Sequence, residues 1–236
     1  MQLPIFFEEH LPAAGKLVLS PESSRHIVRV LRMQPGEELL LTDGRGLLVT
    51  GKISNLEKRE TEVLVVSKQL LAMPQPRVAI GISLIKNPTR FEWFLEKATE
   101  IGVAEIVPFI GRRTEKQHFR FDRMKSVVIS AMLQSQQAWL PTLHEPVSLD
   151  TVLANPAFAC KYIAHCGAGE KIQLRDAPVF ANNQMILIGP EGDFTPEEIS
   201  AAKAANYLPV GLGGTRLRTE TAGIVAAVLL LHHAIV

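Results

Sequence analysis

The chain has 236 residues, of which 47% are hydrophobic and 21% are charged, and its formal net charge is +1. These values are typical of a globular protein and exclude a disordered chain, while the presence of only two cysteines, Cys160 and Cys166, excludes a disulfide framework. The longest apolar run, Ala222–Leu231, is about half as long as a membrane span, and no Cys/His spacing suggests a metal site. Because no basic leader begins the chain either, we expect a cytoplasmic protein.

The first part of the chain, residues 1–73, predicts a small β-barrel. Its short apolar runs are separated by turn sequences such as Gln34-Pro35-Gly36, which is the pattern of an antiparallel barrel or sandwich. The runs are Lys16–Leu19, Glu38–Thr42, Leu47–Gly51 and Glu62–Ser67. One helix, predicted over Ser23–Arg32, interrupts them and places Ile27, Val30 and Leu31 on one face.

Two groups of basic residues stand out on this nearly neutral chain. Arg25, Arg29 and Arg32 lie at positions i, i+4 and i+7 of the predicted helix, a spacing that suits contact with a phosphate backbone. Between Arg112 and Lys125, six basic residues stand against two acidic ones. We expect both groups to contact a polyanion, and solvent-exposed surface charge is the alternative for either group.

After a linker at Pro74-Gln75-Pro76, residues 74–236 alternate between strands and helices. Continuous apolar runs are typical of parallel strands that are buried on both faces, and here they are Val78–Ile85, Glu105–Phe109, Tyr162–His165, Met185–Ile188 and Leu208–Leu212. Helices are predicted over Arg90–Ile101, after the capping box Thr195-Pro196-Glu197-Glu198, and over Glu220–His233. The last helix is apolar nearly all round, so we expect it in the core or in a subunit interface. The sum is a mostly parallel α/β domain.

Two glycine-rich loops follow the last two predicted strands. The first runs from Gly189 to Phe194 and the second from Gly211 to Ala222, and neither has the spacing of a P-loop or of a dinucleotide fingerprint. Glycine lets backbone approach a ligand closely, and ligands of open α/β folds bind outside the carboxyl ends of the strands. We therefore expect the loops to converge at adjacent strand ends and form one site; two unrelated turns are the alternative.

These residues resemble the ribosomal RNA small subunit methyltransferase E (RsmE) family, a family of SPOUT-class methyltransferases. The resemblance covers nearly the whole chain and lies in His26–Arg32, in Glu96–Gly102, in a stretch from Gln134-Ser135 through Pro141 that matches a middle helix, and in the two glycine-rich loops. Leu217–Ala222 is its most specific part.

The resemblance implies a fold, a cofactor and a substrate. Residues 1–73 are expected to form a PUA-like RNA-binding β-barrel, and residues 74–236 a SPOUT α/β domain that is tied in a trefoil knot and works as a homodimer. The expected reaction is methylation of N3 of a uridine in 16S ribosomal RNA, with S-adenosyl-L-methionine as donor and S-adenosyl-L-homocysteine as product. Which nucleotide is modified, and whether 16S ribosomal RNA or the assembled small ribosomal subunit is the partner, stays open.

The candidate site residues follow from what this reaction needs. Uracil N3 is a nucleophile only after it loses a proton, so Arg218 is the candidate for stabilising the uracil anion. Glu220 is the candidate base, or the group that orients Arg218; a helix-dipole role is its alternative. The cofactor-binding candidates are Ile188, Gly189, Gly192, Leu212, Gly213, Leu217, Thr219 and Cys166, and the RNA-binding candidates are Arg25, Arg29, Arg32, Arg112 and Arg113. His165 and Cys166 line the adenine pocket or are ordinary core residues.

Some positions depart from the family pattern, and other functions are compatible with the chain. Asp193 replaces a usual glycine, Leu133 and Gln137 replace a usual glutamate and arginine, and Arg216 replaces an aliphatic residue. One alternative function is RNA binding without catalysis. A second is an α/β enzyme whose Arg216 and Arg218 clamp a small anion. A third is methyl transfer to another RNA position, such as a ribose hydroxyl.

Overall fold

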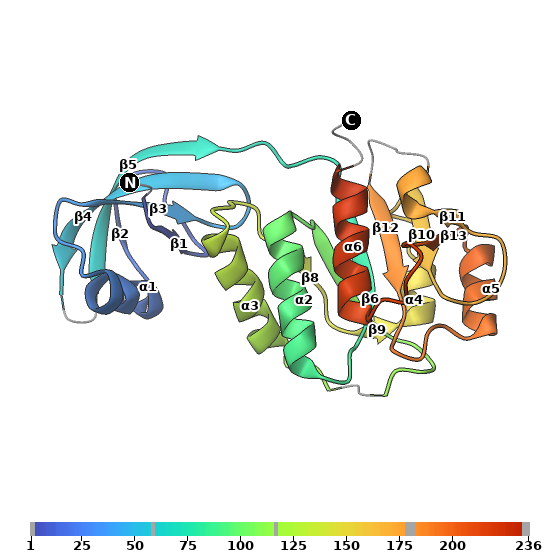
Figure 1. The fold of residues 1–236 in the computed structure, drawn as a ribbon. Coiled ribbons are helices and arrows are strands. Elements are labelled where there is room, and N and C mark those ends of the chain that lie inside the picture. The colour runs from blue at the N-terminus through green and yellow to red at the C-terminus, as the bar shows by residue number, and fades with distance from the viewer. Residues whose placement is uncertain (1–2, 58–59, 116–117, 178–182, 233–236) are drawn as a thin grey trace. The chain divides into compact units, whose positions relative to one another are not determined.

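The computed structural model describes residues 3–57, 60–115, 118–177 and 183–232 (Figure 1). The chain divides into two compact units. The first comprises Met1–Met73 and Met132–Leu140, and the second comprises Pro74–Ala131 and Pro141–Val236. The first unit therefore takes residues from the middle of the chain as well as from its N-terminal part.

The first unit is built on a five-stranded sheet with the order β1-β3-β4-β5-β2. The strands are β1 (Ile5–Phe7), β2 (Lys16–Val18), β3 (Glu38–Thr42), β4 (Leu47–Leu56) and β5 (Thr61–Leu70). β1 pairs with β3 in parallel, and the other pairs are antiparallel. Its core includes Leu39, Leu41, Val49 and Val63, all of which are fully buried. The four apolar runs of the sequence are confirmed as strands, and only β1 had no predicted counterpart.

The prediction of one α-helix over Ser23–Arg32 is wrong in the type of helix. The segment is a short α-helix, α1 (Pro21–Arg25), that continues as a π-helix over His26–Leu31. It ends at Arg32, which adopts a left-handed conformation with φ +54°. Because a π-helix bonds each residue to the fifth one along the chain, apolar residues at α-helical spacing no longer share one buried face. Ile27 is fully buried, whereas Val30 is 66% exposed.

The segment Met132–Leu140 packs against the turn between β3 and β4. The backbone N–H of Gly46 donates to the Ala138 carbonyl at 2.9 Å, and the N–H of Leu140 donates to the Gly44 carbonyl at 2.8 Å. The indole N–H of Trp139 donates to the Ala72 carbonyl at 3.1 Å. These bonds make the segment part of the first unit.

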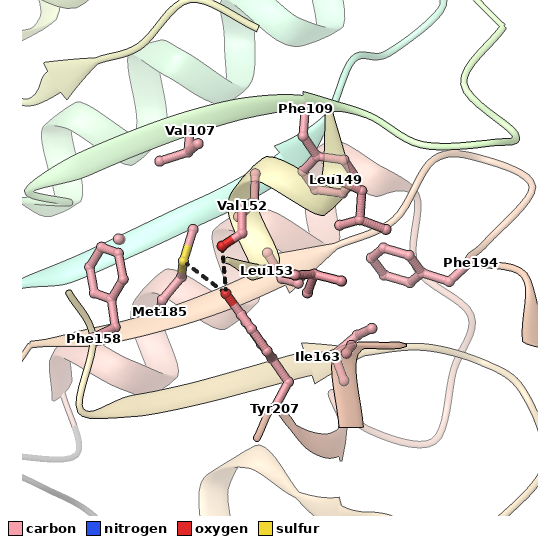
Figure 2. Close-up of a cluster of buried hydrophobic side chains, with 13 residues drawn as sticks. Val107, Phe109, Leu149, Val152, Leu153, Phe158, Ile163, Met185, Phe194 and Tyr207 are labelled. Atoms are coloured by element: carbon pink, nitrogen blue, oxygen red, sulfur yellow. Dashed lines mark hydrogen bonds between the residues drawn. The ribbon is translucent and has the colours of Figure 1, made fainter. Parts of the chain in front are cut away.

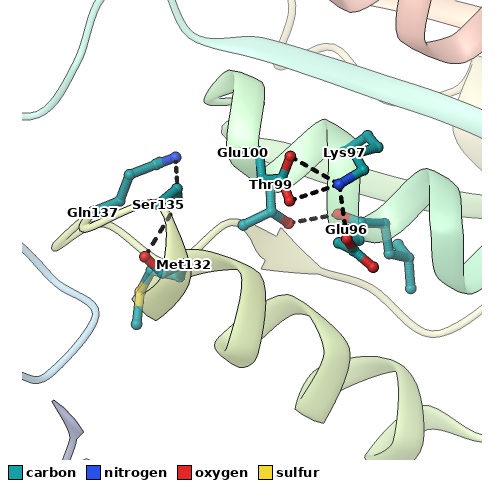
Figure 3. Close-up of polar contacts among 8 residues, drawn as sticks. Glu96, Lys97, Thr99, Glu100, Met132, Ser135 and Gln137 are labelled. Atoms are coloured by element: carbon teal, nitrogen blue, oxygen red, sulfur yellow. Dashed lines mark hydrogen bonds and ion pairs between the residues drawn. The ribbon is translucent and has the colours of Figure 1, made fainter. Parts of the chain in front are cut away.

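The resemblance placed a helix from Gln134 through Pro141, and this expectation is wrong. Helix α3 (Phe121–Gln134) ends where that stretch begins, and residues 135–141 form turns and a bridge. The hydroxyl of Ser135 donates to the Met132 carbonyl at 3.2 Å, and the amide of Gln137 donates to the Ser135 hydroxyl at 2.9 Å (Figure 3). These local bonds compete with the helical ones.

The second unit is an α/β domain whose strand pairs are all parallel, which confirms the predicted class. The sheet order is β11-β13-β10-β12-β6-β7-β8, with β9 also paired to β7. Its strands are β6 (Val78–Ser83), β7 (Glu105–Ile110), β8 (Thr142–Leu143), β9 (Val147–Ser148), β10 (Cys160–Ala164), β11 (Ile172–Gln173), β12 (Gln184–Ile188) and β13 (Leu208–Gly211). The helices besides α3 are α2 (Pro88–Ile101), α4 (Leu149–Leu153), α5 (Pro196–Ala204) and α6 (Thr219–His232), with a 3-10 turn at Leu174–Asp176.

A cluster of buried apolar side chains fills one side of this sheet (Figure 2). The Phe109 and Phe194 rings stack with centroids 5.9 Å apart. Tyr207 is buried among the cluster, where its hydroxyl donates to the Val152 carbonyl at 3.4 Å, and burial raises its pKa to about 12. Phe194 ends the first glycine-rich loop, so this stacking fixes one end of that loop to the core.

The helix ends follow the sequence closely. Asn87 caps α2 by accepting a hydrogen bond from the N–H of Thr89, and Gly102 ends the helix at φ +100°. On α2, the Lys97 ammonium donates to carboxylates of Glu96 and Glu100, which raises the Lys97 pKa (Figure 3).

Helix α6 packs against α2 and β6, as its apolar sequence predicts. His233, at the end of the predicted helix, lies outside the described residues. In the described part of the chain, no helix has the length and apolar character needed to cross a membrane.

The predicted capping box at α5 is confirmed, and it has an additional partner. Thr195 and Glu198 bond reciprocally, and the second carboxylate oxygen of Glu198 accepts the backbone N–H of Arg112 at 2.8 Å. Glu198 is 7% exposed. This carboxylate therefore joins the loop after β7 to the start of α5.

Replacing Glu198 with alanine tests this junction. The Glu198→Ala change leaves two backbone donors without acceptors, so we expect the free energy of unfolding to fall by about 3 kcal/mol. Urea denaturation measures this loss. The neighbouring Glu197→Ala variant is the control. Because Glu197 is exposed, this substitution should lower the free energy of unfolding by less than about 1 kcal/mol. Equal losses in the two variants would contradict the role of Glu198.

Candidate functional site

A cleft of about 690 Å³ lies over the carboxyl ends of β10, β12 and β13. It is lined by Ala164–Cys166, Lys171, Gln173, Ile188–Glu191, Asp193, Val210–Thr219 and Ala222. β12 and β13 precede the two glycine-rich loops, but in the sheet β10 lies between them. The expectation that these strands are adjacent is therefore wrong, and the two loops approach each other across the end of β10.

A hydrogen bond joins the two loops directly. The hydroxyl of Thr219, the first residue of α6, donates to the Gly189 carbonyl at 3.1 Å. Thr219 is 4% exposed, so this bond is shielded from water. A second link runs from the Arg216 guanidinium to the Glu191 carbonyl at 3.5 Å. The convergence of the two loops, predicted from their position in the chain, is confirmed.

Three glycines of the cleft stand where a side chain would be unfavourable, two because of close neighbours and one because of its backbone conformation. A Cβ at Gly189 would lie 3.0 Å from the Phe194 ring, and a Cβ at Gly211 would lie 2.8 Å from the Gln173 amide. Gly213 has φ +129°, a conformation that residues with a Cβ rarely adopt. These positions bring bare backbone to the cleft.

Asp193 joins the first loop to the end of β10. Its carboxylate accepts the backbone N–H of Cys166 at 2.8 Å through one oxygen and the N–H of Phe194 at 2.8 Å through the other. Its backbone is left-handed, with φ +64°, which is unfavourable for most residues with a Cβ. The two hydrogen bonds offset this strain.

The wall formed by the loop after β10 contains a half-buried histidine. Both ring nitrogens of His165 are buried and have no hydrogen-bond partner in the described structure. Burial, and then the charge of Lys171, lower the pKa of His165. The Lys171 ammonium donates to the carbonyls of His165 and Gly167, at 3.0 and 2.7 Å. No sequence pattern indicated Lys171 or Gln173, because the short strand β11 has no apolar run.

The structure brings most of the cofactor-binding candidates together. Ile188, Gly189, Leu212, Gly213, Leu217, Thr219 and Cys166 all line the cleft. Gly192 lies outside the lining, and its carbonyl accepts a hydrogen bond from the Arg113 guanidinium at 2.7 Å. Arg113 therefore supports the first glycine-rich loop from outside the cleft lining, although its side chain is exposed. Arg112 is also exposed, and its backbone is held by Glu198.

The two catalytic candidates lie in different surroundings. Arg218 is exposed, lines the cleft, and pairs with no carboxylate among the described residues. Glu220 is 7% exposed and outside the lining; one of its oxygens lies 3.7 Å from Nε of Arg90 on α2, and the other has no hydrogen-bond partner in the part of the chain described. The structure thus does not pair Glu220 with Arg218.

The remaining candidates lie in the first unit, where Arg25, Arg29 and Arg32 are all exposed on α1 and the π-helix. Of the departures from the family pattern, Leu133 is half-buried near the end of α3, and Gln137 bonds to Ser135.

Among the described residues, no cluster of three or more His, Cys, Asp or Glu side chains is arranged to hold a metal ion.

Comparisons with known proteins bear on both units. Residues 73–231 match the family described as RNA methyltransferase domain, and residues 19–66 match the RNA methyltransferase PUA domain. The chain is 30% identical to the ribosomal RNA small subunit methyltransferase E of Mycobacterium bovis, over 94% of this chain and 88% of that protein. It is 26% identical to the protein of the same name from Rickettsia conorii, over 94% and 92% of the two chains.

Solved structures give the same result. A probable rRNA-methyltransferase from Porphyromonas gingivalis superposes with a TM-score of 0.89 at 37% identity, covering 95% of each chain. A ribosomal RNA small subunit methyltransferase E from Neisseria gonorrhoeae, bound to S-adenosyl methionine, gives a TM-score of 0.87 at 28% identity, covering 98% of each chain. The chain therefore belongs to the ribosomal RNA small subunit methyltransferase E family, with a PUA-like first unit and a SPOUT-class methyltransferase second unit.

Proposed function

We propose that this protein methylates N3 of a uridine in 16S ribosomal RNA, with S-adenosylmethionine as the methyl donor. The observation that carries the proposal is the cleft between the two glycine-rich loops, in a chain that matches the RNA methyltransferase family over residues 73–231. The name of the Mycobacterium bovis relative supports small-subunit ribosomal RNA as the substrate. The proposed partner is therefore 16S ribosomal RNA or the small ribosomal subunit, and the proposed location is the cytoplasm.

The cleft fits an adenosyl cofactor in size and in chemistry. Its volume of about 690 Å³ suits a small molecule. His165 lines the cleft while its two ring nitrogens are buried, so it offers mainly apolar surface, and Gly189 and Gly213 offer backbone groups. S-adenosylmethionine, when bound, supplies an electrophilic methyl group that needs alignment more than activation.

Arg218 is proposed to stabilise the uracil anion. The methylated nitrogen carries a proton in neutral uracil, and loss of that proton to solvent water places negative charge on the ring. The Arg218 guanidinium lines the cleft without a carboxylate partner among the described residues, so its charge is available to that anion. Glu220 lies outside the lining and faces Arg90, so we propose that it positions the first turn of α6.

We also propose that the protein works as a homodimer and that its second unit is tied in a trefoil knot. Exposed apolar side chains on α2 and α6 support a subunit interface, because Trp93 is 43% exposed and Val228 is 38% exposed. The two helices pack against each other, so both exposed side chains belong to one helix pair.

Mass spectrometry of 16S ribosomal RNA tests the proposed reaction. A strain that lacks this protein should lose one N3-methyluridine, and the purified protein with S-adenosylmethionine should restore it in small subunits from that strain. A missing ribose methylation instead would place the transfer on another atom. Unchanged ribosomal RNA, with no heat on titration with S-adenosylmethionine, would favour an RNA-binding protein without catalysis.

The role of Arg218 is tested by an Arg218→Ala variant. We expect turnover on small subunits to fall by at least about 100-fold, because the developing anion loses its positive partner, while S-adenosylmethionine binding changes less than about threefold. Radiolabelled methyl transfer and calorimetry measure the two effects. Arg175→Ala is the matched control, because Arg175 is exposed and pairs with Asp176 outside the cleft. Loss of cofactor binding in Arg218→Ala would assign Arg218 to the cofactor instead.

The link made by Asp193 is tested by an Asp193→Asn variant. Asparagine tolerates the left-handed backbone, but its NH₂ cannot accept a hydrogen bond from the N–H of Cys166. One charge-assisted bond between the first glycine-rich loop and the loop after β10 is therefore lost. We expect S-adenosylmethionine affinity to fall by about 10-fold in calorimetry, since a neutral bond is about half as strong as a charged one. Asp176→Asn, at an exposed position, should leave it unchanged. Wild-type affinity in Asp193→Asn would show that the link does not shape the cofactor pocket.

A further inference from the structure

The π-helix of the first unit displays two neighbouring aliphatic side chains. Val30 is 66% exposed and Leu31 is 42% exposed. Scattered surface hydrophobics are ordinary, but these two are consecutive and lie on a rare type of helix that occurs frequently at functional sites. Ile27, in the same turn, is fully buried and anchors the π-helix to the barrel core.

Three exposed arginines lie close to this aliphatic pair in the sequence. Arg25, Arg29 and Arg32 are exposed, and no carboxylate of the described residues forms an ion pair with any of them. By contrast, Lys16 of the same unit is paired with Glu62 at 2.7 Å. The segment thus combines available positive charge with an apolar surface.

The turn is held in place before any partner binds. The Ser20 hydroxyl caps α1 and donates to the Glu8 carboxylate at 2.9 Å. Further along, the hydroxyl of Ser24 accepts the N–H of Thr61 at 3.1 Å, and the N–H of Met33 donates to the Ile27 carbonyl at 3.2 Å. The Ser24–Thr61 bond ties the start of the segment to β5, and the side chain of Met33, just after the π-helix, is buried in the barrel core. The aliphatic pair therefore cannot turn inward without breaking these contacts.

We propose that Val30 and Leu31 pack against the face of an unstacked base of the substrate RNA, while the three arginines hold the phosphates beside it. This rests on the proposed function, which makes RNA the substrate. Phosphate contact alone gains nothing from two exposed aliphatic side chains, and a continuous duplex hides its base faces by stacking. Unpaired RNA exposes base faces that apolar side chains can cover, and proteins read sequence in RNA mostly at such places.

A pair of RNA probes and a pair of variants test this surface. The probes are a hairpin with an unpaired loop and a fully paired duplex of equal length. The variant Val30→Ser/Leu31→Ser keeps every charge, so we expect about 10-fold weaker binding to the hairpin, less than twofold change for the duplex, and an unchanged dependence on salt. Arg25→Ala/Arg29→Ala/Arg32→Ala should weaken binding to both probes and reduce the salt dependence.

The control is Val66→Ser/Leu70→Ser, which removes two exposed aliphatic side chains of the same unit on β5; it should bind both probes like the wild type. Thermal unfolding and S-adenosylmethionine binding of each variant confirm that the fold is kept. Equal loss for hairpin and duplex, or no loss for either, would overturn the proposal. So would a loss seen only with assembled small subunits, which would identify a ribosomal protein as the partner. Methyl transfer by the wild type to small subunits tests the proposed function separately.

Discussion

The hydrogen bond from the Thr219 hydroxyl to the Gly189 carbonyl is the contact on which the cleft depends. It joins two loops whose strands are separated in the sheet by β10, and it is buried at the start of α6. Asp193 completes the arrangement by binding the end of β10 itself. Three separate strand ends thus become one rigid rim. A site that must align a methyl donor with a weak nucleophile requires such pre-formed geometry.

The residues behind the rim act on the same loops. The Glu198 carboxylate holds the backbone of Arg112, and the neighbouring Arg113 donates to the carbonyl of Gly192. The Phe109–Phe194 stacking fixes the far end of the loop to the core. Arg113 remains exposed while making its contact, so one side chain supports the loop and still presents charge at the surface. A structural contact and an exposed positive charge therefore coincide at this position.

Most helices and strands could be predicted from patterns among neighbouring residues. Contacts between residues far apart in the chain could not. The capping box at Thr195, the glycine end of α2 and the apolar strands depend on neighbouring residues, so the sequence shows them. The π-helix escaped prediction because Ile27, Val30 and Leu31 have the spacing of an α-helix. The partner of Asp193 lies 27 residues earlier in the chain and is brought near only by the order of strands in the sheet. For the same reason no pattern indicated that Glu220 faces Arg90 instead of the cleft.

The contribution of Met132–Leu140 to the first unit has a consequence for biosynthesis. The turn between β3 and β4 obtains its hydrogen-bond partners from Ala138 and Leu140, far downstream of the last barrel strand. During translation, a nascent chain that has emerged only as far as Met73 lacks these partners, and the carbonyl of Gly44 and the N–H of Gly46 stay open to water. Completion of the barrel must wait until more than half of the polypeptide has left the exit tunnel, so the barrel is not free to mature ahead of the rest of the protein.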